Sequence, residues 1–371
     1  MDGMAQDEPL RLAHSRRSRR IAGIVISLCI TVAIFVLVIP NVASYSDVWS
    51  TITDLTWLEL VSLIVVMTFN LVTYWPQQVA AMPGLTLAQA AVNNQTTTTI
   101  ADVIPGGAAI AVAFGYVIYR SWGFTPAEIT LQALVTGIWN IYMKLGMPVI
   151  ALAVLAVYGY SGAGLLVAAV IGVIVLITSV VVLALVLWKK AVARRVGSAL
   201  GRVASFARRM VRKPPVQDWG ASAVRLRRQT IDLVSRRWIQ LTGFTLLSHS
   251  ALFLVLLLSL RHVGISEREV SWAEVFGVFA FVRLLSALPL TPGGIGVVEL
   301  GYIAAFNVAG GDHAQVVAAV LLFRAVTYGL QVPLGGITYI LWRRKKSWIK
   351  TPPEHVETPG EPPVGLVARP I

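Results

Sequence analysis

Long apolar stretches alternate with short polar ones along most of the chain. The apolar stretches fall at about 21–39, 57–75, 85–119, 127–157, 163–188, 238–260, 271–308 and 314–342. All of them reach the roughly 18 to 20 residues that an α-helix needs to cross the hydrocarbon core of a bilayer. The pattern therefore predicts an all-α integral membrane protein.

Two of these stretches, 85–119 and 271–308, are too long for one straight span, and each contains Pro-Gly-Gly near its middle. Proline lacks a backbone donor and glycine favours non-helical conformations, so each sequence predicts a broken helix. Unpaired backbone groups at membrane depth are tolerated only where protein or a wet cavity covers them. We expect the breaks to form part of a polar site, although small residues at these positions also suit close helix packing.

The basic residues fix the expected topology. RRSRR (16–20) precedes the first apolar stretch, RRKK (343–346) follows the last, and the segment 189–237 is rich in Lys and Arg. Basic juxtamembrane segments lie on the cytoplasmic side. This holds for all three only if 85–119 and 271–308 each enter and leave the membrane on one side. We predict six full spans, two broken re-entrant hairpins that enter from opposite faces, and cytoplasmic N- and C-termini.

The two broken stretches also match each other in sequence. A PGG triplet, a Gly-Tyr pair and a later proline recur in the same order at nearly constant spacing: 105–107 with 292–294, Gly115-Tyr116 with Gly301-Tyr302, and Pro148 with Pro333. The predicted unit is span, span, re-entrant hairpin, span, repeated in inverted orientation. Inverted repeats around broken helices are typical of secondary transporters, whose binding sites lie near the bilayer midplane.

The expected domain organisation follows from these features. It comprises a basic cytoplasmic N-terminus (1–20), a first membrane repeat (21–157), a second, inverted membrane repeat (163–188 and 238–342), a basic cytoplasmic loop (189–237) and a basic, then Pro-rich, disordered tail (343–371).

Composition supports a membrane protein and argues against nucleic-acid binding, metal binding and catalysis. Hydrophobic residues make up 56% of the chain and charged residues 13%, against about 25% charged in soluble domains. The net charge is +13, and the basic clusters that produce it flank the predicted spans. The basic loop 189–237 is therefore expected to attract anionic lipid headgroups rather than nucleic acid. Cys29 is the single cysteine, and the histidines lack ligand spacing. We therefore expect no metal site, no cofactor and, without a nucleophile–base pair, no enzymatic activity.

Ionisable side chains inside spans are rare because each is costly in lipid, so they mark candidate sites. Arg283 and Glu299 flank the second PGG, and Arg324 lies one helical turn before Tyr328. In one interpretation Arg283 and Glu299 only neutralise each other. In the other, Arg283 and Arg324 bind a phosphate, and Glu299 pairs with a cationic headgroup or carries a proton.

Lys144, beside Asn140, occupies the matching region of the first repeat, and Asp102 is a weaker candidate. The polar run NNQTTTT (93–99) either lines a cavity or forms a polar wall without a ligand. The predicted substrate-binding residues are Pro105, Gly106, Gly107, Asn140, Lys144, Arg283, Pro292, Gly293, Gly294, Gly296, Glu299, Arg324 and Tyr328.

The stretches RLLSALPLTPGGIGVVELGY (283–302) and LLFRAVTYGLQVPLGG (321–336) resemble the lysylphosphatidylglycerol synthase transmembrane region, also called the flippase-like domain family. The resemblance extends from about residue 20 to 345. It implies functional roles for Arg283, Pro292, Gly293, Gly294, Glu299 and Arg324. In two-domain members the membrane region moves an aminoacylated phospholipid between leaflets, and a separate domain synthesises that lipid. We expect no such domain in this chain, and the resemblance to stand-alone relatives implies a lipid or lipid-linked sugar substrate without choosing between them.

We therefore expect a flippase-like transporter that moves a phospholipid, such as an aminoacylated one, or a lipid-linked intermediate across a bacterial plasma membrane. Two alternatives remain open. In the first, the chain is a non-transporting scaffold or lipid-presenting subunit, and a separate lipid-modifying enzyme docks at its basic loop. In the second, it is a proton-coupled small-solute carrier.

Overall fold

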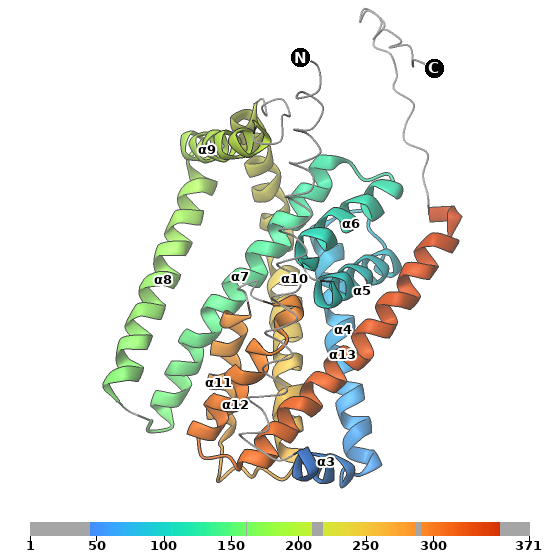
Figure 1. Ribbon diagram of the computed structural model, residues 1–371. Helices are drawn as coiled ribbons and strands as arrows, with labels where there is room; N and C mark the ends of the chain where they lie inside the picture. The colour runs from blue at the N-terminus through green and yellow to red at the C-terminus, as the bar shows by residue number, and fades with distance from the viewer. Residues whose placement is uncertain (1–44, 105, 161, 210–217, 287–290, 349–371) are drawn as a thin grey trace, which may run out of the picture.

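The computed structural model of this chain describes residues 45–104, 106–160, 162–209, 218–286 and 291–348 (Figure 1). Within these residues all regular structure is helical. The expected first span, its basic N-terminal flank and the Pro-rich tail beyond residue 348 lie outside the described residues.

Five helices in the described part are long and apolar enough to cross a membrane. They are α4 (Trp57–Ala81), α7 (Pro126–Val157), α8 (Ala163–Trp188), α10 (Trp219–His262) and α13 (His313–Arg344). These helices confirm an all-α, multi-pass membrane protein. Each matches a predicted span, but α10 is 44 residues long and extends well into the segment expected to be a basic loop. Most of the remaining basic segment forms α9 (Lys190–Arg209), so this region is largely helical.

Each Pro-Gly-Gly stretch separates two shorter helices that pack against each other. The first pair is α5 (Leu87–Val103) and α6 (Gly107–Ser121); the second is α11 (Trp272–Leu285) and α12 (Val297–Val308), with the short 3-10 turn η2 (Pro292–Gly294) between them. The α5–α6 hairpin opens toward the end of the bundle where α9 lies, and the α11–α12 hairpin opens toward the end where α3 (Tyr45–Thr53) lies (Figure 1).

Local sequence explains where the first helix of each hairpin begins. Thr86 caps α5 and Ser271 caps α11, and in both cases the side chain three residues later bonds back to the cap. These Thr-x-x-Gln and Ser-x-x-Glu boxes satisfy amides that a helix start leaves unpaired. The same device begins α7 at Thr125 and α4 at Thr56.

Helix α13 joins the two hairpins. Its N-terminal half packs on α12, and its C-terminal half packs on α5. The polar run supplies the second contact: Thr99 donates to the Gln331 carbonyl at 3.0 Å, and Thr96 and Thr338 share a hydrogen bond of 3.0 Å. Hydroxyl groups bonded across helices hold a membrane bundle together where the hydrophobic effect does not.

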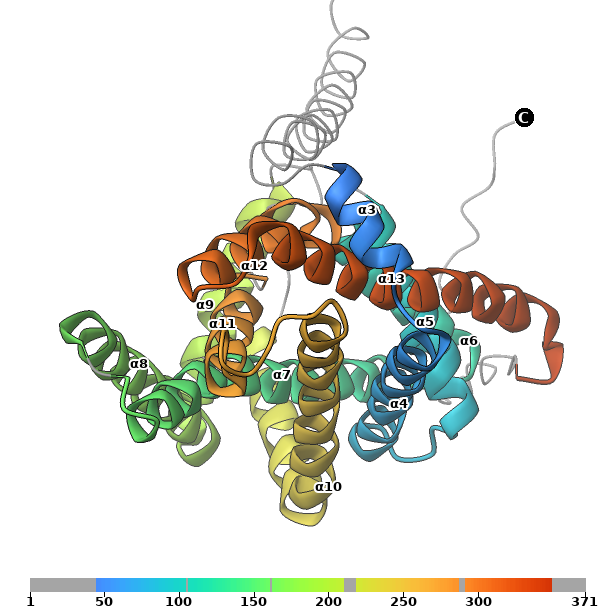
Figure 2. The ribbon, with the colours of Figure 1, turned by 90° about the horizontal axis from the view of Figure 1, so that it is seen from below.

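The main core lies between α4, α7, α10, α11, α12 and α13. Leu63, Val255, Phe279, Phe306 and Val317 are fully buried there. Seen along the bundle, α8 stands apart from this core beside α7 (Figure 2), and none of its residues is buried. Its contact with α7 includes a hydrogen bond of 2.7 Å from the Tyr142 hydroxyl to the Ser179 carbonyl.

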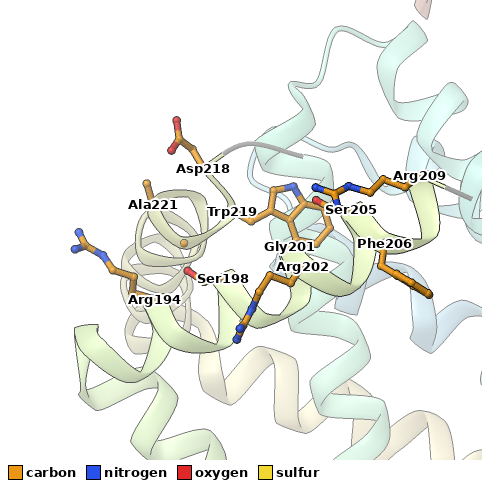
Figure 3. Close-up of a pocket in the computed structure, with 11 residues that line it drawn as sticks. Arg194, Ser198, Gly201, Arg202, Ser205, Phe206, Arg209, Asp218, Trp219 and Ala221 are labelled. Atoms are coloured by element: carbon orange, nitrogen blue, oxygen red, sulfur yellow. The ribbon is translucent and has the colours of Figure 1, made fainter. Parts of the chain in front are cut away.

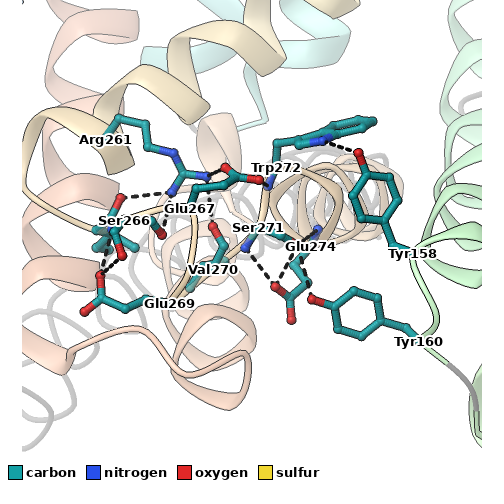
Figure 4. A network of polar contacts seen from close by, with 11 residues as sticks. Tyr158, Tyr160, Arg261, Ser266, Glu267, Glu269, Val270, Ser271, Trp272 and Glu274 are labelled. Carbon is teal, nitrogen blue, oxygen red and sulfur yellow. Dashed lines mark hydrogen bonds and ion pairs between the residues drawn. The ribbon is translucent and has the colours of Figure 1, made fainter.

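A polar network fixes the open end of the second hairpin (Figure 4). Arg261, in the last turn of α10, pairs with Glu267 and donates to the carbonyls of Ile265 and Val270, both at 2.9 Å. The indole of Trp272 at the start of α11 donates to the Tyr158 hydroxyl at 2.9 Å. The network ties the α10–α11 connection and the end of α7 together, and so sets where α11 begins.

Two adjacent glycines of α13 test the contact between α13 and the first hairpin. A Cβ on Gly335 would lie 2.0 Å from Thr99 Oγ1 and 2.7 Å from the Gln95 carbonyl, whereas one on Gly336 would meet nothing within 4 Å. We expect Gly335→Ala to lower stability by about 1–3 kcal/mol through overpacking. Gly336→Ala should be neutral or should stabilise the helix by up to about 1 kcal/mol. Thermal unfolding in detergent measures both, and equal effects would show that this contact is absent.

Candidate functional site

The second break lies against the first hairpin in the interior of the bundle. A Cβ placed on Gly293 would lie 3.1 Å from the backbone carbonyl oxygen of Asp102, near the end of α5. Residues far apart in sequence, from both hairpins and from the middle of α13, therefore meet at one place.

An ion pair between Glu299 and Arg324 lies at the centre of this meeting point. Arg324 Nε donates to Glu299 Oε1 at 2.6 Å, and Glu299 is 2% exposed. Glu299 stands three residues after Gly296, the residue that caps α12, and its other oxygen accepts from the Gly296 amide at 2.7 Å. The carboxylate thus caps the first turn of α12 and also neutralises the Arg324 guanidinium.

The backbone of the break is bound from α13 as well. The Gly293 carbonyl accepts from the Tyr328 hydroxyl at 2.6 Å and from Arg324 Nη2 at 3.1 Å. The Arg324 guanidinium lies over the Tyr328 ring, 4.8 Å from its centroid, in a cation–π contact. Gly293 has a φ of +57°, and a Cβ there would lie 2.2 Å from the Tyr328 hydroxyl, so only glycine fits.

A second group of basic residues lies near this ion pair without an equivalent acid. Arg283, in the last turn of α11, interacts electrostatically with Lys144 of α7 and with His249 of α10, and Lys144 also acts on His249. Arg283 Nε and His249 Nε2 are buried and have no hydrogen-bond partner among the described residues. His249 donates from Nδ1 to the Thr245 carbonyl at 3.0 Å, so the positive charge comes from Arg283 and Lys144. We call these two residues, with His249 beside them, the cationic cluster.

The carboxyl group of Asp102 attracts both arginines, and its electrostatic interaction with Arg324 is stronger than that with Arg283. It forms no ion pair within the described residues, where the salt bridges are Arg324–Glu299, Arg261–Glu267 and His262–Glu59. The cluster is therefore left with a partly buried positive charge, which is unfavourable unless an anion binds there.

Glu299 thus pairs with Arg324 and not with Arg283, contrary to one of the two sequence-based interpretations. The reason is the packing of α13 along α12, which carries the Arg324 guanidinium to the carboxylate. Arg283 instead lies among basic groups from α7 and α10.

The structure brings together Lys144, Arg283, Gly293, Glu299, Arg324 and Tyr328 of the predicted set, as described above. Pro292 starts η2, and Gly294 and Gly296 complete the break with positive φ angles. In the first hairpin, Gly106 is exposed, and a Cβ on Gly107 would lie 2.2 Å from the Ile100 carbonyl, so Gly107 serves the tight α5–α6 connection. Pro105 lies outside the described residues. Asn140 donates to Thr136 of its own helix at 2.8 Å and is not part of the cluster.

His249 is a member of the cluster that the sequence analysis missed. It is 1% exposed and lies within the span expected at 238–260. His249 lacks the spacing of a metal ligand. The informative signal was an ionisable side chain inside an apolar span, the same criterion that selected Arg283 and Lys144.

The Glu299–Arg324 pair predicts a distinctive pattern of stability. Glu299→Gln or Arg324→Gln alone strands a buried charge, and we expect each to lower stability by roughly 3–5 kcal/mol. The double variant removes both charges and should recover most of that loss. Thermal unfolding in detergent of the two single variants and the double variant gives the coupling. Additive losses would mean that the two residues do not act as a pair.

Comparison with known proteins gives the family. The model of the lysylphosphatidylglycerol synthase TM region matches residues 20–335. A further match is the UPF0104 membrane protein MJ1078 of Methanocaldococcus jannaschii, 36% identical over 72 residues. That segment is 19% of this chain and 31% of the relative, so the match spans under a third of the curated protein. Because the family model covers most of the chain, this protein belongs to the family of the lysylphosphatidylglycerol synthase TM region.

Proposed function

We propose that this protein is a flippase-like transporter that moves a phospholipid or a lipid-linked intermediate between the leaflets of a bacterial plasma membrane. The observation that carries the proposal is the cationic cluster, in which the buried Arg283 Nε donor has no hydrogen-bond partner among the described residues. A phosphodiester is the anion that most membrane lipids carry, and guanidinium and ammonium groups are the side chains that bind it best.

The cluster suits a phosphate that binds and leaves again. Buried polar groups are almost always hydrogen-bonded, so an orphaned Arg283 Nε and His249 Nε2 need an explanation. A bound phosphodiester would accept from Arg283 Nε and would balance the charges of Arg283 and Lys144. His249 Nε2 is an acceptor instead, because Nδ1 donates to the Thr245 carbonyl. Arg324, in contrast, already has a permanent partner in Glu299. The family to which the chain belongs supports a lipid as the source of the phosphate.

We further propose that both hairpins re-enter the membrane from opposite faces. The helices α5, α6, α11 and α12 contain 17, 15, 14 and 12 residues, or about 26, 23, 21 and 18 Å, and none reaches the roughly 30 Å of a hydrocarbon core. Their open ends lie at opposite ends of the bundle (Figure 1). The helix that follows each hairpin, α7 or α13, has 32 residues and an internal proline, Pro148 or Pro333, which supports an inverted repeat.

In this arrangement the end of the bundle with α9 and the C-terminal end of α13 faces the cytoplasm, by the positive-inside rule. The cluster then lies between two hairpins of opposite orientation. Rocking of one repeat against the other would expose the headgroup site to each leaflet in turn.

Replacement of Arg283 separates binding from folding. Arg283→Gln should lower transport of a fluorescent phospholipid in proteoliposomes by about tenfold to a hundredfold, equivalent to about 1.5–3 kcal/mol for a lost charged hydrogen bond. Its thermal stability should stay the same or rise, because an uncompensated buried charge is removed.

The matched control is Arg324→Gln, which removes the same charge from a paired position and should lose stability. Unchanged transport in a folded Arg283→Gln protein would overturn the transport proposal and would favour a lipid-presenting scaffold. Loss of stability in Arg283→Gln equal to that in Arg324→Gln would assign Arg283 a structural role.

Cysteine labelling tests the re-entrant topology. Cys29→Ser gives a cysteine-free chain, in which single cysteines replace Ser46, Arg120 or Gly310. With an impermeant thiol reagent on intact cells we expect labelling at 46 and 310, and protection at 120, because the first hairpin returns to the cytoplasmic side. Labelling at position 120 would mean that 85–119 crosses the membrane and would remove the inverted repeat.

A further inference from the structure

The helix α9 turns sharply away from the span that precedes it. The span α8 ends at Trp188, and α9 begins at Lys190 and runs across the end of the bundle (Figure 1). With 26 residues, α8 is about 39 Å long, enough to cross the hydrocarbon core, so its end lies at the membrane surface. The exposed ring of Trp188 suits that level, where tryptophan is enriched.

One face of α9 packs on the start of α10. Cβ atoms added to Gly197 and Gly201 would lie 2.4 Å from Ala223 Cβ and 3.0 Å from Trp219 Cβ, respectively. Ala193 on the same face is buried. These small residues allow the two helices to cross closely, so α9 is held in a fixed place against α10.

A second face of α9 is apolar and exposed. Val196, Leu200, Val203 and Phe206 recur at helical spacing and are 40%, 56%, 67% and 68% exposed. Phe206 lies at the edge of this stripe and also lines the pocket described below (Figure 3). Nothing in the described residues covers this stripe, which has the composition of a face that inserts into lipid.

The remaining face of α9 is basic. The helix carries six Lys or Arg residues and no acid. Three of its arginines, Arg194, Arg202 and Arg209, line a pocket of about 710 Å³ between α9 and the start of α10, together with Ser198, Ser205 and the ring of Trp219 (Figure 3). Asp218 is the single acid at the pocket wall among the described lining residues.

We propose that α9 lies in the plane of the membrane surface and that this pocket binds the phosphodiester headgroup of an anionic phospholipid. The phosphate accepts from the guanidinium and hydroxyl groups nearest to it along α9, and the other arginines, which point in different directions (Figure 3), attract neighbouring headgroups. The apolar stripe lies among the acyl chains beside it. The site lies at the end of the bundle, is separate from the cationic cluster and does not depend on transport.

Charge and shape together point to a lipid rather than a soluble anion or nucleic acid. Either of those ligands would use the arginines and leave the apolar stripe exposed to water. A lipid surface uses both faces, because acyl chains and phosphates lie at adjacent depths. Each basic side chain near an anionic surface contributes about 1 kcal/mol to that attraction.

Lipid retention tests the pocket. The full-length protein in mild detergent is mixed with equal amounts of phosphatidylglycerol and phosphatidylcholine, and retained lipids are counted by native mass spectrometry. We expect the triple variant Arg194→Gln, Arg202→Gln, Arg209→Gln to lose preference for phosphatidylglycerol by at least about fivefold, the effect of one such contact.

The matched control removes the same charge from exposed positions that do not line the pocket: Arg195→Gln, Arg228→Gln and Arg236→Gln. This triple variant should keep the preference. Equal losses in the two triple variants would replace the pocket with a diffuse basic surface, and no loss in either would overturn the site. Displacement of phosphatidylglycerol by millimolar inorganic phosphate would assign the pocket to a soluble anion and would also overturn the proposal.

Depth measurements test the orientation of α9 separately. In the Cys29→Ser background, a fluorophore on a cysteine at Val203 should be quenched most by a nitroxide near the headgroup of vesicle lipids. A fluorophore at Val180, exposed in the middle of α8, should be quenched most by a nitroxide deep in the acyl chain. Quenching at position 203 by an aqueous quencher, and by neither lipid probe, would place α9 in water and overturn the proposal.

Discussion

The pairing of Glu299 with Arg324 is the constraint on which the interior of this protein depends. A buried ion pair is tolerated only when its geometry is good and its remaining polar atoms are bonded. Here the second carboxylate oxygen accepts from the Gly296 amide, and the guanidinium also donates to the Gly293 carbonyl. Glu299 and Arg324 thus neutralise each other and also bind the backbone groups that the break leaves without helical partners. In an open loop exposed to lipid, those groups would stay unpaired. Because Arg324 lies in α13, the same contacts fix the second hairpin to the helix that also holds the first.

This pairing also decides which charge is available for a ligand. Arg283 and Arg324 are both arginines inside the bundle, and composition does not distinguish them. Once Glu299 belongs to Arg324, Arg283 is left beside Lys144 and His249. A protein that only needed stability would gain by replacing such a residue with an apolar one. Retention of an uncompensated charge is the kind of local conflict expected at functional sites.

The sequence predicted the elements well and their partners less well. Pro-Gly-Gly marked both breaks, because the local conformations of proline and glycine do not depend on tertiary contacts. The partner of Glu299 depends on which face of α13 meets α12, and no local pattern reports that register. The segment 189–237 was interpreted by its charge alone, so the helical spacing of Val196, Leu200 and Val203 was overlooked. The polar run 93–99 was recognised as unusual, and the structure shows that Thr96 and Thr99 bond to α13.

The two hairpins match in design but differ in charge. Both α6 and α12 begin at their break, so both direct the positive end of a helix dipole into the bundle. In α12 the Glu299 carboxylate occupies that end, whereas α6 has no acid in its first turn. The first hairpin instead has Asp102 at the end of α5, near Arg283 and Arg324 but without an ion pair to either in the described residues. The acid of the second hairpin is therefore paired with α13, the next helix in the chain, whereas Asp102 of the first hairpin lies near basic residues from later helices. In the transport cycle proposed above, a movement of the first hairpin against the second would change the distance between Asp102 and these two arginines. Such a movement would alter the net charge felt by a bound phosphate without breaking the Glu299–Arg324 pair.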